Sequence, residues 1–384
     1  MPAPIEPSSL TEAEMRSASK QAVSRVDRID VSACTIPTDF PESDGTIAWD
    51  ETTIVIVEAK SGETTGIGYT YAGASAAKLI DGLLRRVVEG RDAMDVPGAW
   101  SAMVQSVRNL GRPGIASTAI SAVDIALWDV KARLLGLSLV KLIGAVRTGI
   151  PVYGSGGFTS YPVDRLQHQL SGWVESGIRM VKMKVGRNHD RDLARVRSAR
   201  EAIGKAAGLF VDANGAYTRK QALQFAALFR EADVTWFEEP VSSDDLDGLR
   251  LIRDRGPAGM EIAAGEYGYD ANYFRRMLQS GAVDVQQADA TRCGGVTGFL
   301  QAGALCAAHS MPLSAHTAPS IHMHLCCSQP SAIHLEYFHD HVRIENMLFD
   351  GFEKPRNGEL VPDLARPGLG LDIRRDAVSK YEAR

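Results

Sequence analysis

The sequence has few cysteines, and their spacing does not suggest a cluster. Its 384 residues include five cysteines, an odd number, and no Cys-x-x-Cys pair occurs. A low cysteine density without such a pair argues against a disulfide framework and against a structural zinc site. We therefore expect a protein that works in a reducing compartment.

Long apolar runs and an excess of basic charge are also missing. No segment approaches the roughly 20 apolar residues of a membrane span, and no apolar run near the start marks a secretory signal. The formal net charge is −5, from 42 basic and 47 acidic side chains, and no basic stripe suits phosphate backbones or anionic lipid. The sequence predicts a cytoplasmic protein that binds neither nucleic acid nor membranes.

Motifs of several common enzyme classes do not occur. The run GIGYTY has Tyr71 where a dinucleotide fingerprint needs its third glycine. No GxSxG nucleophile elbow and no GxxxxGK phosphate loop is present. The protein is therefore not expected to be a dinucleotide-dependent oxidoreductase, an α/β-hydrolase or a P-loop enzyme.

Composition and pattern divide the chain into four parts. Residues 1–20 are rich in Pro, Ser and Glu and are expected to form a loosely held tail. Residues 21–148 combine β-rich runs around Thr53–Val57 with helical patterns over 77–110 and 116–136, which predicts an α+β capping domain. Residues 149–348 alternate short apolar runs with amphipathic stretches. The Pro/Gly-rich segment 349–384 is expected to return to the capping domain.

The alternating part predicts a parallel β/α barrel. Eight apolar runs of strand length are separated by stretches of helix length, the arrangement of repeated β/α units. The fold class is therefore α/β, a modified (β/α)8 barrel with an α+β N-terminal capping domain. The predicted strands span 150–156, 180–185, 209–214, 235–240, 261–266, 283–289, 311–316 and 331–337.

Charged side chains recur at the ends of these strands. Since all strands of such a barrel end at one rim, these side chains should converge there. Asp212, Glu238 and Glu266 come from three consecutive strands, and three converging carboxylates repel one another unless a cation lies between them. Oxygen ligands without His or Cys favour a hard ion, Mg²⁺ first and Mn²⁺ second.

Two further groups at the rim are suited to moving protons. Lys182 and Lys184 are two residues apart, so both point to the same side of their strand, and two adjacent ammonium groups lower each other's pKa. Asp289 and His316 end neighbouring strands, and a carboxylate beside an imidazole fixes its tautomer and raises its basicity. A lysine and a His–Asp pair on either side of one metal would provide two bases.

At these residues the sequence resembles the enolase superfamily, in particular its mandelate racemase subgroup, whose members use a Lys or His base with Mg²⁺. The barrel of this family is of the (β/α)7β type, and the resemblance covers most of the chain. The matching motifs are VKMKVG (181–186), VDANGAY (211–217), WFEEP (236–240), AAGE (263–266), DATRCGGVTG (289–298), PLSAH (312–316) and HLEYF (334–338).

The resemblance implies a role for each matched residue. Asp212, Glu238 and Glu266 would hold Mg²⁺, and Lys184 and His316, the latter oriented by Asp289, would be the acid/base residues. Lys182 would neutralise the substrate carboxylate, Glu336 would hydrogen-bond it, and Asn214 would line the same pocket. Arg292 departs from the racemase, which has a lysine there. Because arginine stays charged and cannot act as a base, this position is electrostatic or structural.

The implied reaction is abstraction of the proton α to a carboxylate. Loss of a β-hydroxyl would then make it dehydration of an acid sugar, an aldonate or an aldarate, whereas return of the proton to the other face would make it a racemase or epimerase of a 2-hydroxy acid. A third alternative is a non-catalytic binding barrel, disfavoured because every expected acid, base and ligand is retained. The resemblance also implies a homo-oligomer with a small sugar acid as its partner.

Two other features bear on the substrate and on the metal. The segment Pro37–Glu51, expected to be a loop of the capping domain, is largely polar and favours a polyhydroxylated substrate over an aromatic one. The pairs His322/His324 and His339/His341 are interpreted as loop or pocket-wall residues and not as a second metal site, because no matching carboxylate trio accompanies them.

Overall fold

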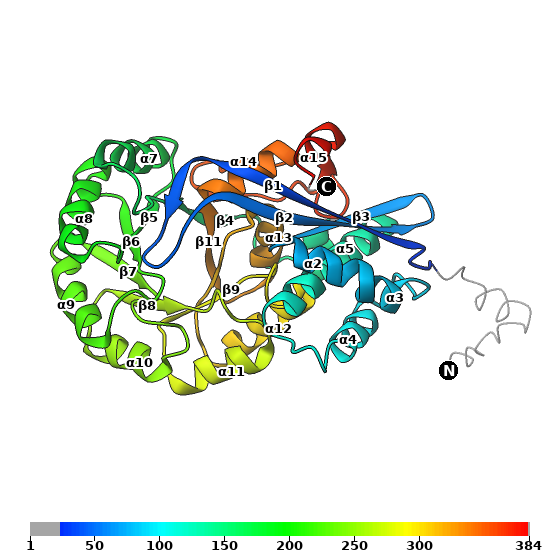
Figure 1. Cartoon of the computed structure of the whole chain (residues 1–384), viewed down its shortest axis with the longest axis horizontal. Coiled ribbons are helices and arrows are strands. Elements are labelled where there is room, and N and C mark those ends of the chain that lie inside the picture. The colour runs from blue at the N-terminus through cyan, green and yellow to red at the C-terminus, as the bar shows by residue number, and fades with distance from the viewer. Residues whose placement is uncertain (1–23, 383–384) are drawn as a thin grey trace, which may run out of the picture.

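The computed structural model describes residues 24–382, so the tail expected at residues 1–20 lies outside the described residues. Eight parallel strands form a closed barrel (Figure 1). Each pairs with the next, and pairing of the last strand with the first closes the ring. The predicted barrel is therefore confirmed. Its strands are β4 (Ile150–Gly156), β5 (Met180–Lys184), β6 (Gly208–Asp212), β7 (Val234–Glu238), β8 (Glu261–Ala264), β9 (Val285–Ala288), β10 (Leu313–Ala315) and β11 (Ala332–Phe338).

Helices cover the outside of the barrel, as Figure 1 shows for α7 to α11. The helix that follows the last barrel strand, α14, packs against α13 and also against α15 of the C-terminal segment. The C-terminal segment therefore contributes to the helical layer at this point. The helices are α7 (Val163–Glu175), α8 (His189–Ile203), α9 (Arg219–Arg230), α10 (Leu246–Arg255), α11 (Ala271–Ser280), α12 (Gly295–Ala308), α13 (Pro319–Ser328) and α14 (His339–Leu348).

An antiparallel sheet of three strands precedes the barrel: β1 (Arg28–Ser43), β2 (Ala48–Ser61) and β3 (Thr64–Tyr71). The strands expected around Thr53–Val57 and after the following turn are β2 and β3. No strand was expected for β1, because Pro37 and Pro41 interrupt its pattern. Both prolines are tolerated because β1 is an edge strand, where a missing N–H breaks no ladder.

Helices pack on one side of this sheet. The expected helix at 116–136 is α5 (Ile115–Leu134), a mostly buried helix that packs on β2 and β3. The expected helix at 77–110 is broken into several pieces, because Gly90 has φ +83° and Asp95 caps a new helix by accepting a hydrogen bond from the N–H of Gly98 at 3.1 Å. The pieces are α2 (Ala74–Leu79), the π-helix η1 (Ile80–Leu84), α3 (Arg85–Val88) and α4 (Val96–Ser106), and α6 (Leu139–Ile143) follows α5.

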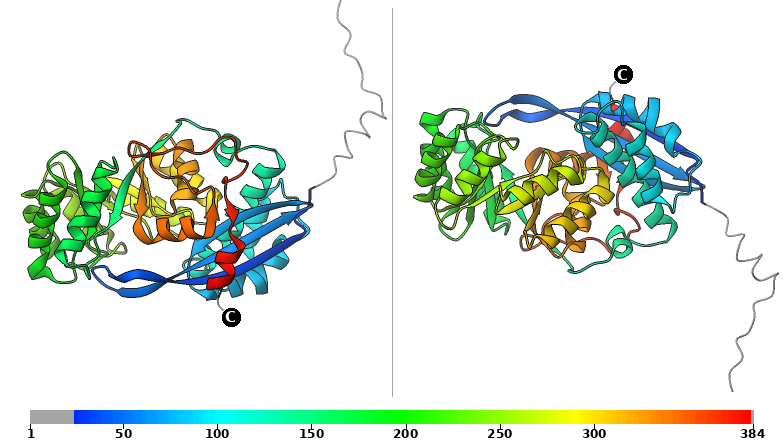
Figure 2. Two further views of the ribbon diagram at one scale, coloured as in Figure 1. Left: turned by 90° about the horizontal axis from the view of Figure 1, so that it is seen from above. Right: turned by 90° about the horizontal axis from the view of Figure 1, so that it is seen from below.

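The segment Pro37–Glu51 is not a loop, as the sequence suggested, but the tip of the β1–β2 hairpin. The hairpin reaches from the small sheet to the barrel (Figures 1 and 2). In its turn, Oδ1 of Asp44 accepts two backbone N–H groups at 2.6 and 2.8 Å. A Cβ atom on Gly45 would lie 2.4 Å from the carbonyl oxygen of Ala213 and 2.7 Å from that of Val185. The turn therefore packs so closely on the barrel that no side chain fits there.

Aromatic and polar contacts hold the hairpin tip on the barrel. Trp49 packs edge-to-face on Phe158, with ring centroids 5.6 Å apart, and Phe40 packs in the same way on Tyr161 at 5.4 Å. The indole N–H of Trp49 donates to Oε2 of Glu42 at 2.9 Å. Glu42 is buried at 1% exposure, so a carboxyl group lies under the aromatic layer.

The C-terminal segment runs back to the small sheet. Its short strand β13 (Glu359–Leu360) pairs with β4, and β12 (Phe349–Asp350) pairs with β14 (Asp372–Ile373). The final helix, α15 (Arg375–Tyr381), lies against β1 (Figure 2), and its Arg375 forms an ion pair with Glu58 of β2. The limits of the domains given above stay predictions. Within residues 24–382, no helix has the length and apolar character that crossing a membrane requires.

Candidate active site

The interior of the barrel is built in two layers. The lower layer is aromatic: Phe210 stacks on Trp236 with centroids 5.2 Å apart, and Tyr153 and His334 pack beside them. Because side chains alternate along a strand, the residue two positions after each member of this layer also points into the barrel. Each of β5, β6, β7 and β11 places a charged side chain above this layer. These side chains are Lys182, Asp212, Glu238 and Glu336, and all four are at most 1% exposed.

The three acids expected to hold a metal do converge. Asp212, Glu238 and Glu266 each place a carboxylate oxygen within 4.8 Å of the others. Asp212 and Glu238 are the last residues of β6 and β7, whereas Glu266 lies in the loop just after β8. Burial and the neighbouring charge of Asp212 raise the pKa of Glu238 to about 8. The crowded acids therefore repel one another, as expected of a cation-binding trio.

Lys182 lies beneath the trio and is fully buried. Its ammonium donates to both carboxylate oxygens of Glu238 at 2.7 Å and lies 2.8 Å from Oε1 of Glu336. Burial alone would lower the pKa of Lys182, but Glu238 and Glu336 raise it well above its ordinary value. Lys182 is therefore a fixed positive charge at the floor of the site.

Lys184 lies on the same side of β5, next to the first acid of the trio. Its Nζ lies 2.5 Å from Oδ2 of Asp212. The sequence predicted that the two lysines would lower each other's pKa, and that effect is present. It is outweighed, however: burial and Lys182 lower the pKa of Lys184, and Asp212 raises it above the ordinary value. The sequence-based prediction took account of the two lysines only and did not include the contact between Lys184 and the carboxylate of Asp212.

His316 and Asp289 form the expected pair. Nδ1 of His316 lies 2.8 Å from Oδ2 of Asp289, and Nε2 lies 3.3 Å from Oε2 of Glu266. Burial lowers the pKa of His316, but Glu266 and Asp289 raise it above its ordinary value. Since Lys184 contacts the first acid of the trio and His316 the third, the trio lies between the two candidate bases.

Glu336 and Asn214 reach the same place. Glu336 accepts a hydrogen bond from the backbone N–H of Thr317 at 3.2 Å. Against the effect of burial, Lys182 and His316 hold the pKa of Glu336 well below its ordinary value, so its carboxylate accepts hydrogen bonds and does not donate them. The backbone N–H of Asn214 donates to Asp212 at 2.8 Å, and its side chain lines the pocket.

Several supporting residues were not singled out from the sequence. The indole N–H of Trp236 donates to Oε2 of Glu238 at 3.0 Å, and Thr291 donates its hydroxyl and its backbone N–H to Asp289, both at 2.7 Å. Glu239, which follows Glu238, is buried with φ +38°. The spacing of Trp236 and Glu238 could have indicated a shared face, and Glu239 is a charged residue at the end of the same predicted strand, but Thr291 carries no such signal.

A pocket of about 360 Å³ lies above these groups. Its barrel side includes Lys184, Asn214, Glu266, His316 and Glu336, and the tip of the hairpin and β3 form the other side. In the segment Pro37–Glu51, Asp44 and Trp49 line the pocket. The hydroxyl groups of Ser43 and Thr159 share a hydrogen bond of 2.6 Å, and Glu42 lies behind Trp49.

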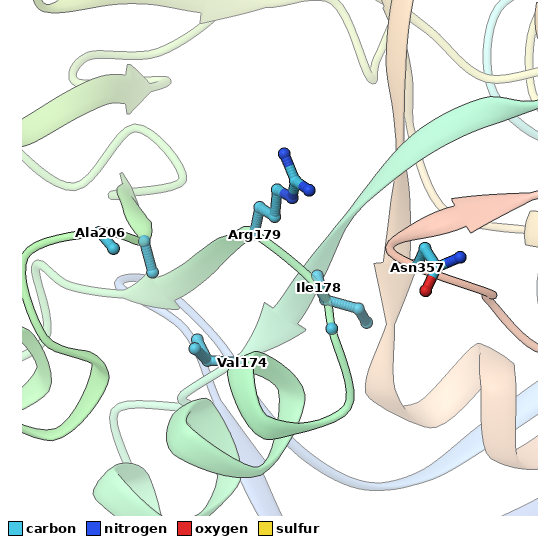
Figure 3. Close-up of a pocket in the computed structure, with 7 residues that line it drawn as sticks. Val174, Ile178, Arg179, Ala206 and Asn357 are labelled. Atoms are coloured by element: carbon cyan, nitrogen blue, oxygen red, sulfur yellow. The ribbon is translucent and has the colours of Figure 1, made fainter.

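A second pocket, of about 460 Å³, is found at the opposite end of the barrel (Figure 3). It lies where β5 and β6 begin, between Val174, Ile178, Ala206 and Asn357. Arg179 is the one charged residue among the described residues that line it. Without an acid or base beside this guanidinium, the pocket offers nothing for proton transfer, and the candidate site is the pocket at the carboxyl ends of the strands.

The sequence suggested that the four other histidines of interest are loop or pocket-wall residues. All four lie on helices, and His341 is a pocket-wall residue. In α13, Nε2 of His322 accepts from the N–H of Ala290 at 2.9 Å, and His324 is buried. At the start of α14, His341 lines the pocket and stacks on Tyr71. His339 lies beside two carboxyl groups, those of Asp39 and Glu42, which the hairpin brings to it, and not beside a trio.

Asp39 is already paired within the protein, whereas Oε2 of Glu42 accepts from the indole of Trp49. Nε2 of His339 lies 3.1 Å from Oδ1 of Asp39, and Arg165 lies 3.3 Å from Oδ2 of the same group. Next to them, Arg343 forms an ion pair with Asp340 at 2.6 Å. This cluster therefore serves to dock the hairpin on the barrel.

The acid trio fits a hard divalent cation. All its ligand atoms are carboxylate oxygens, the donor type of Mg²⁺ and Mn²⁺ sites. Within the described part of the chain, no hydrogen-bond donor is aligned with the buried Oε2 of Glu266 or with Oδ1 of Asn214. Buried oxygens of this kind are costly unless a partner binds them.

The chain is similar to known proteins in sequence and in fold. The chain is similar to a mandelate racemase/muconate lactonizing enzyme-like protein from Rubrobacter xylanophilus, whose crystal structure has 55% identity, covers 94% of this chain and 100% of that one, and superposes with a TM-score of 0.92. It is 32% identical to the L-talarate/galactarate dehydratase of Salmonella typhimurium, covering 92% of this chain and 90% of that protein. One structure of an L-talarate/galactarate dehydratase, a mutant liganded with Mg and L-glucarate, has a TM-score of 0.86 at 29% identity and covers 100% of this chain and 96% of that one.

A third relative is a racemase from Streptomyces coelicolor A3(2) with bound magnesium, at 31% identity and a TM-score of 0.87, covering 93% of this chain and 99% of that one. Two family models match as well. The N-terminal domain of mandelate racemase / muconate lactonizing enzyme matches residues 31–144, and the enolase C-terminal domain-like model matches residues 165–377. With its trio of acids between a lysine and a histidine–aspartate pair, the chain belongs to the enolase superfamily, in the mandelate racemase subgroup.

Proposed function

We propose that the protein is a Mg²⁺-dependent acid-sugar dehydratase that converts an aldonate or an aldarate into a 2-keto-3-deoxy acid. The observation that carries this proposal is the position of the acid trio between two proton-transfer groups, Lys184 and His316. The dehydratases among its relatives, with L-glucarate bound in one, support the same reaction.

Asp212, Glu238 and Glu266 would hold the metal, which supplies positive charge to the substrate carboxylate and so makes the α-proton more acidic. Trp236 fixes Glu238 through its indole N–H, and the backbone N–H of Asn214 fixes Asp212. These contacts set the positions of the ligands before the metal binds, which reduces the cost of organising the site.

Lys182 would neutralise the substrate carboxylate from beneath the acid trio, since it is buried and does not itself line the pocket. As negative charge grows on the carboxylate oxygens during proton abstraction, a fixed ammonium nearby stabilises it without having to reorganise. Glu336 keeps Lys182 in place through their 2.8 Å contact. It can donate a hydrogen bond to the substrate only after it gains a proton, which Lys182 opposes in the free enzyme.

Lys184 and His316 would handle the protons. One of them removes the α-proton, giving an enediolate, and His316 is suited to protonate the β-hydroxyl as it leaves as water. Asp289 holds the imidazole through Nδ1, so Nε2 faces the trio. The enol that remains then takes up a proton at C3 to become the keto acid.

Racemisation or epimerisation of a 2-hydroxy acid is the second candidate. Two bases on either side of the trio could remove and return a proton on opposite faces of one carbon, and a magnesium-bound racemase is among the relatives. Dehydration is favoured because the pocket has acids and hydroxyl groups on its hairpin side, Asp44, Glu51, Thr52 and Thr53, which suit a polyhydroxylated substrate.

A substrate screen distinguishes the two reactions. Aldonates and aldarates would be incubated with enzyme and Mg²⁺ in D₂O, and products identified by mass spectrometry and NMR. Dehydration gives a 2-keto-3-deoxy acid with one deuterium at C3. Deuterium only at C2 of a hydroxy acid, with no keto acid from any sugar, would establish racemisation instead. EDTA should abolish turnover, and Mg²⁺ or Mn²⁺ should restore it.

Variants at the two bases test the assigned roles. Lys184→Ala and His316→Asn should each abolish dehydration, and one of them should still exchange the α-proton with solvent if each base serves one face. Wild-type turnover in either variant would remove that residue from the mechanism. A homo-oligomeric assembly and a cytoplasmic location stay predictions.

A further inference from the structure

The two walls of the active-site pocket differ in charge. The barrel wall presents Lys184, Arg292 and His316. The wall made by the hairpin and β3 presents Asp44 and Glu51 and, among the described residues that line the pocket, no lysine or arginine. This difference concerns the part of the substrate that does not react, because in the proposed function the reacting carboxylate would lie at the acid trio.

The positive groups of the barrel wall are already matched by acids. Nζ of Lys184 lies 2.5 Å from Asp212. Nη1 of Arg292 lies 3.3 Å from Oε1 of Glu266, and its Nε lies 3.6 Å from Oδ2 of Asp289. These cations therefore stay at the reacting end of the pocket and do not offer a free charge to a second carboxylate farther out.

Of the two acids of the hairpin wall, Glu51 is placed to accept hydrogen bonds from a substrate, whereas Oδ1 of Asp44 already accepts from the turn. Glu51 is exposed and lies on the same face of β2 as Trp49 and Thr53, because side chains alternate along the strand. An ionised carboxylate only accepts hydrogen bonds, and a sugar hydroxyl donates them. A second carboxylate on the substrate would have no proton to donate and would be repelled by Asp44 and Glu51.

We infer that the substrate is an aldonate, whose far end is a neutral chain of hydroxyl groups, and not an aldarate with a carboxylate at both ends. Glu51 is the residue that sets this preference. The inference rests on the proposed function and narrows it: both acid-sugar classes could undergo the same reaction at the trio, and the hairpin wall selects between them.

The test compares pairs of the same configuration, galactonate with galactarate and gluconate with glucarate, at fixed Mg²⁺ and pH 7.5. Where a pair is accepted, kcat/KM for the aldonate should exceed that for the aldarate by about tenfold or more, the effect of one unfavourable charge contact in a partly solvated site. Glu51→Lys should lower this ratio by about tenfold, and the neutral Glu51→Gln should lower it by less.

Asp50→Lys is the matched control, because Asp50 is exposed on the opposite face of β2 and does not line the pocket. It should leave the ratio unchanged, which separates a local effect from a change in net charge. Preferential dehydration of aldarates by the wild-type enzyme would overturn the inference and leave the proposed function standing. Folded Glu51 variants with the wild-type ratio would overturn the role of Glu51. If no acid sugar is dehydrated, the proposed function fails and the inference with it.

Discussion

Replacing Glu42 with glutamine should make the protein more resistant to alkaline pH. Glu42 lies at the tip of the hairpin, buried at 1% exposure, with Oε2 accepting from the indole of Trp49. Burial and the charge of Asp340 raise the pKa of Glu42 from 4.5 to about 9. At neutral pH the folded protein therefore holds a proton on this side chain that the unfolded chain has released.

The sign and size of the effect follow from this difference in bound protons. The stability from Glu42 is fully present below pH 4.5 and is lost as the pH rises towards 9, because only the folded state binds the proton in that window. The slope is about 1.4 kcal/mol per pH unit for one proton, so the free energy of unfolding should fall by about 2.7 kcal/mol between pH 6 and pH 8 from this group. Glutamine has nearly the same shape and does not titrate.

Urea unfolding of the wild type and of Glu42→Gln at pH 6 and at pH 8 measures the effect, since the contributions of all other groups cancel in the difference. The free energy of unfolding of the variant, relative to that of the wild type, should be about 2 to 3 kcal/mol higher at pH 8 than at pH 6. Glu63→Gln, at an exposed glutamate in the turn between β2 and β3, is the control and should show no such gain. A difference between wild type and Glu42→Gln that is the same at both pH values would refute the reasoning.

Three further predictions concern the site and its cover. Asp289→Asn should lower kcat by about 10²- to 10⁴-fold, because His316 loses the charge that orients it. Calorimetry should show unchanged Mg²⁺ affinity, and a loss of kcat below tenfold would contradict the role of Asp289 in orienting His316. Gly45→Ala should raise KM and lower the free energy of unfolding by about 1 to 3 kcal/mol, since the added methyl group would clash with the carbonyl oxygen of Ala213. An unchanged KM would show that the turn can move aside. Trp236→Phe should weaken Mg²⁺ binding by about 10- to 100-fold in a titration, because Glu238 loses a donor, and wild-type affinity would exclude this positioning role.

The barrel and its charged rim were predictable because their signals are local. Apolar runs mark the strands, and a charged residue at the end of a run such as Asp212 or Glu238 is conspicuous. The strand ends shifted slightly: Glu266, Asp289 and His316 lie in the loops just after their strands. These three side chains still converge with the others, since loops that follow parallel strands meet at the same rim of the barrel.

The hairpin was not predictable, because its structure depends on contacts between distant parts of the chain. Asp39 contacts His339, 300 residues away, and β1 contains two prolines that its edge position tolerates. The pKa of Lys184 was misjudged for a related reason. Strand spacing shows which residues share a face, but the 2.5 Å contact with Asp212 depends on how two strands pair.

The closure of the barrel between β4 and β11 affects how the protein is made. On the ribosome, β4 is completed at Gly156, but its neighbour β11 begins at Ala332. At typical rates of synthesis the intervening residues take about 10 to 35 s to add. Throughout that time the hairpin wall has been synthesised, while Glu336 is still to come. Nascent chains therefore expose an open sheet edge, and chaperones that shield such edges during translation should raise the yield of active protein.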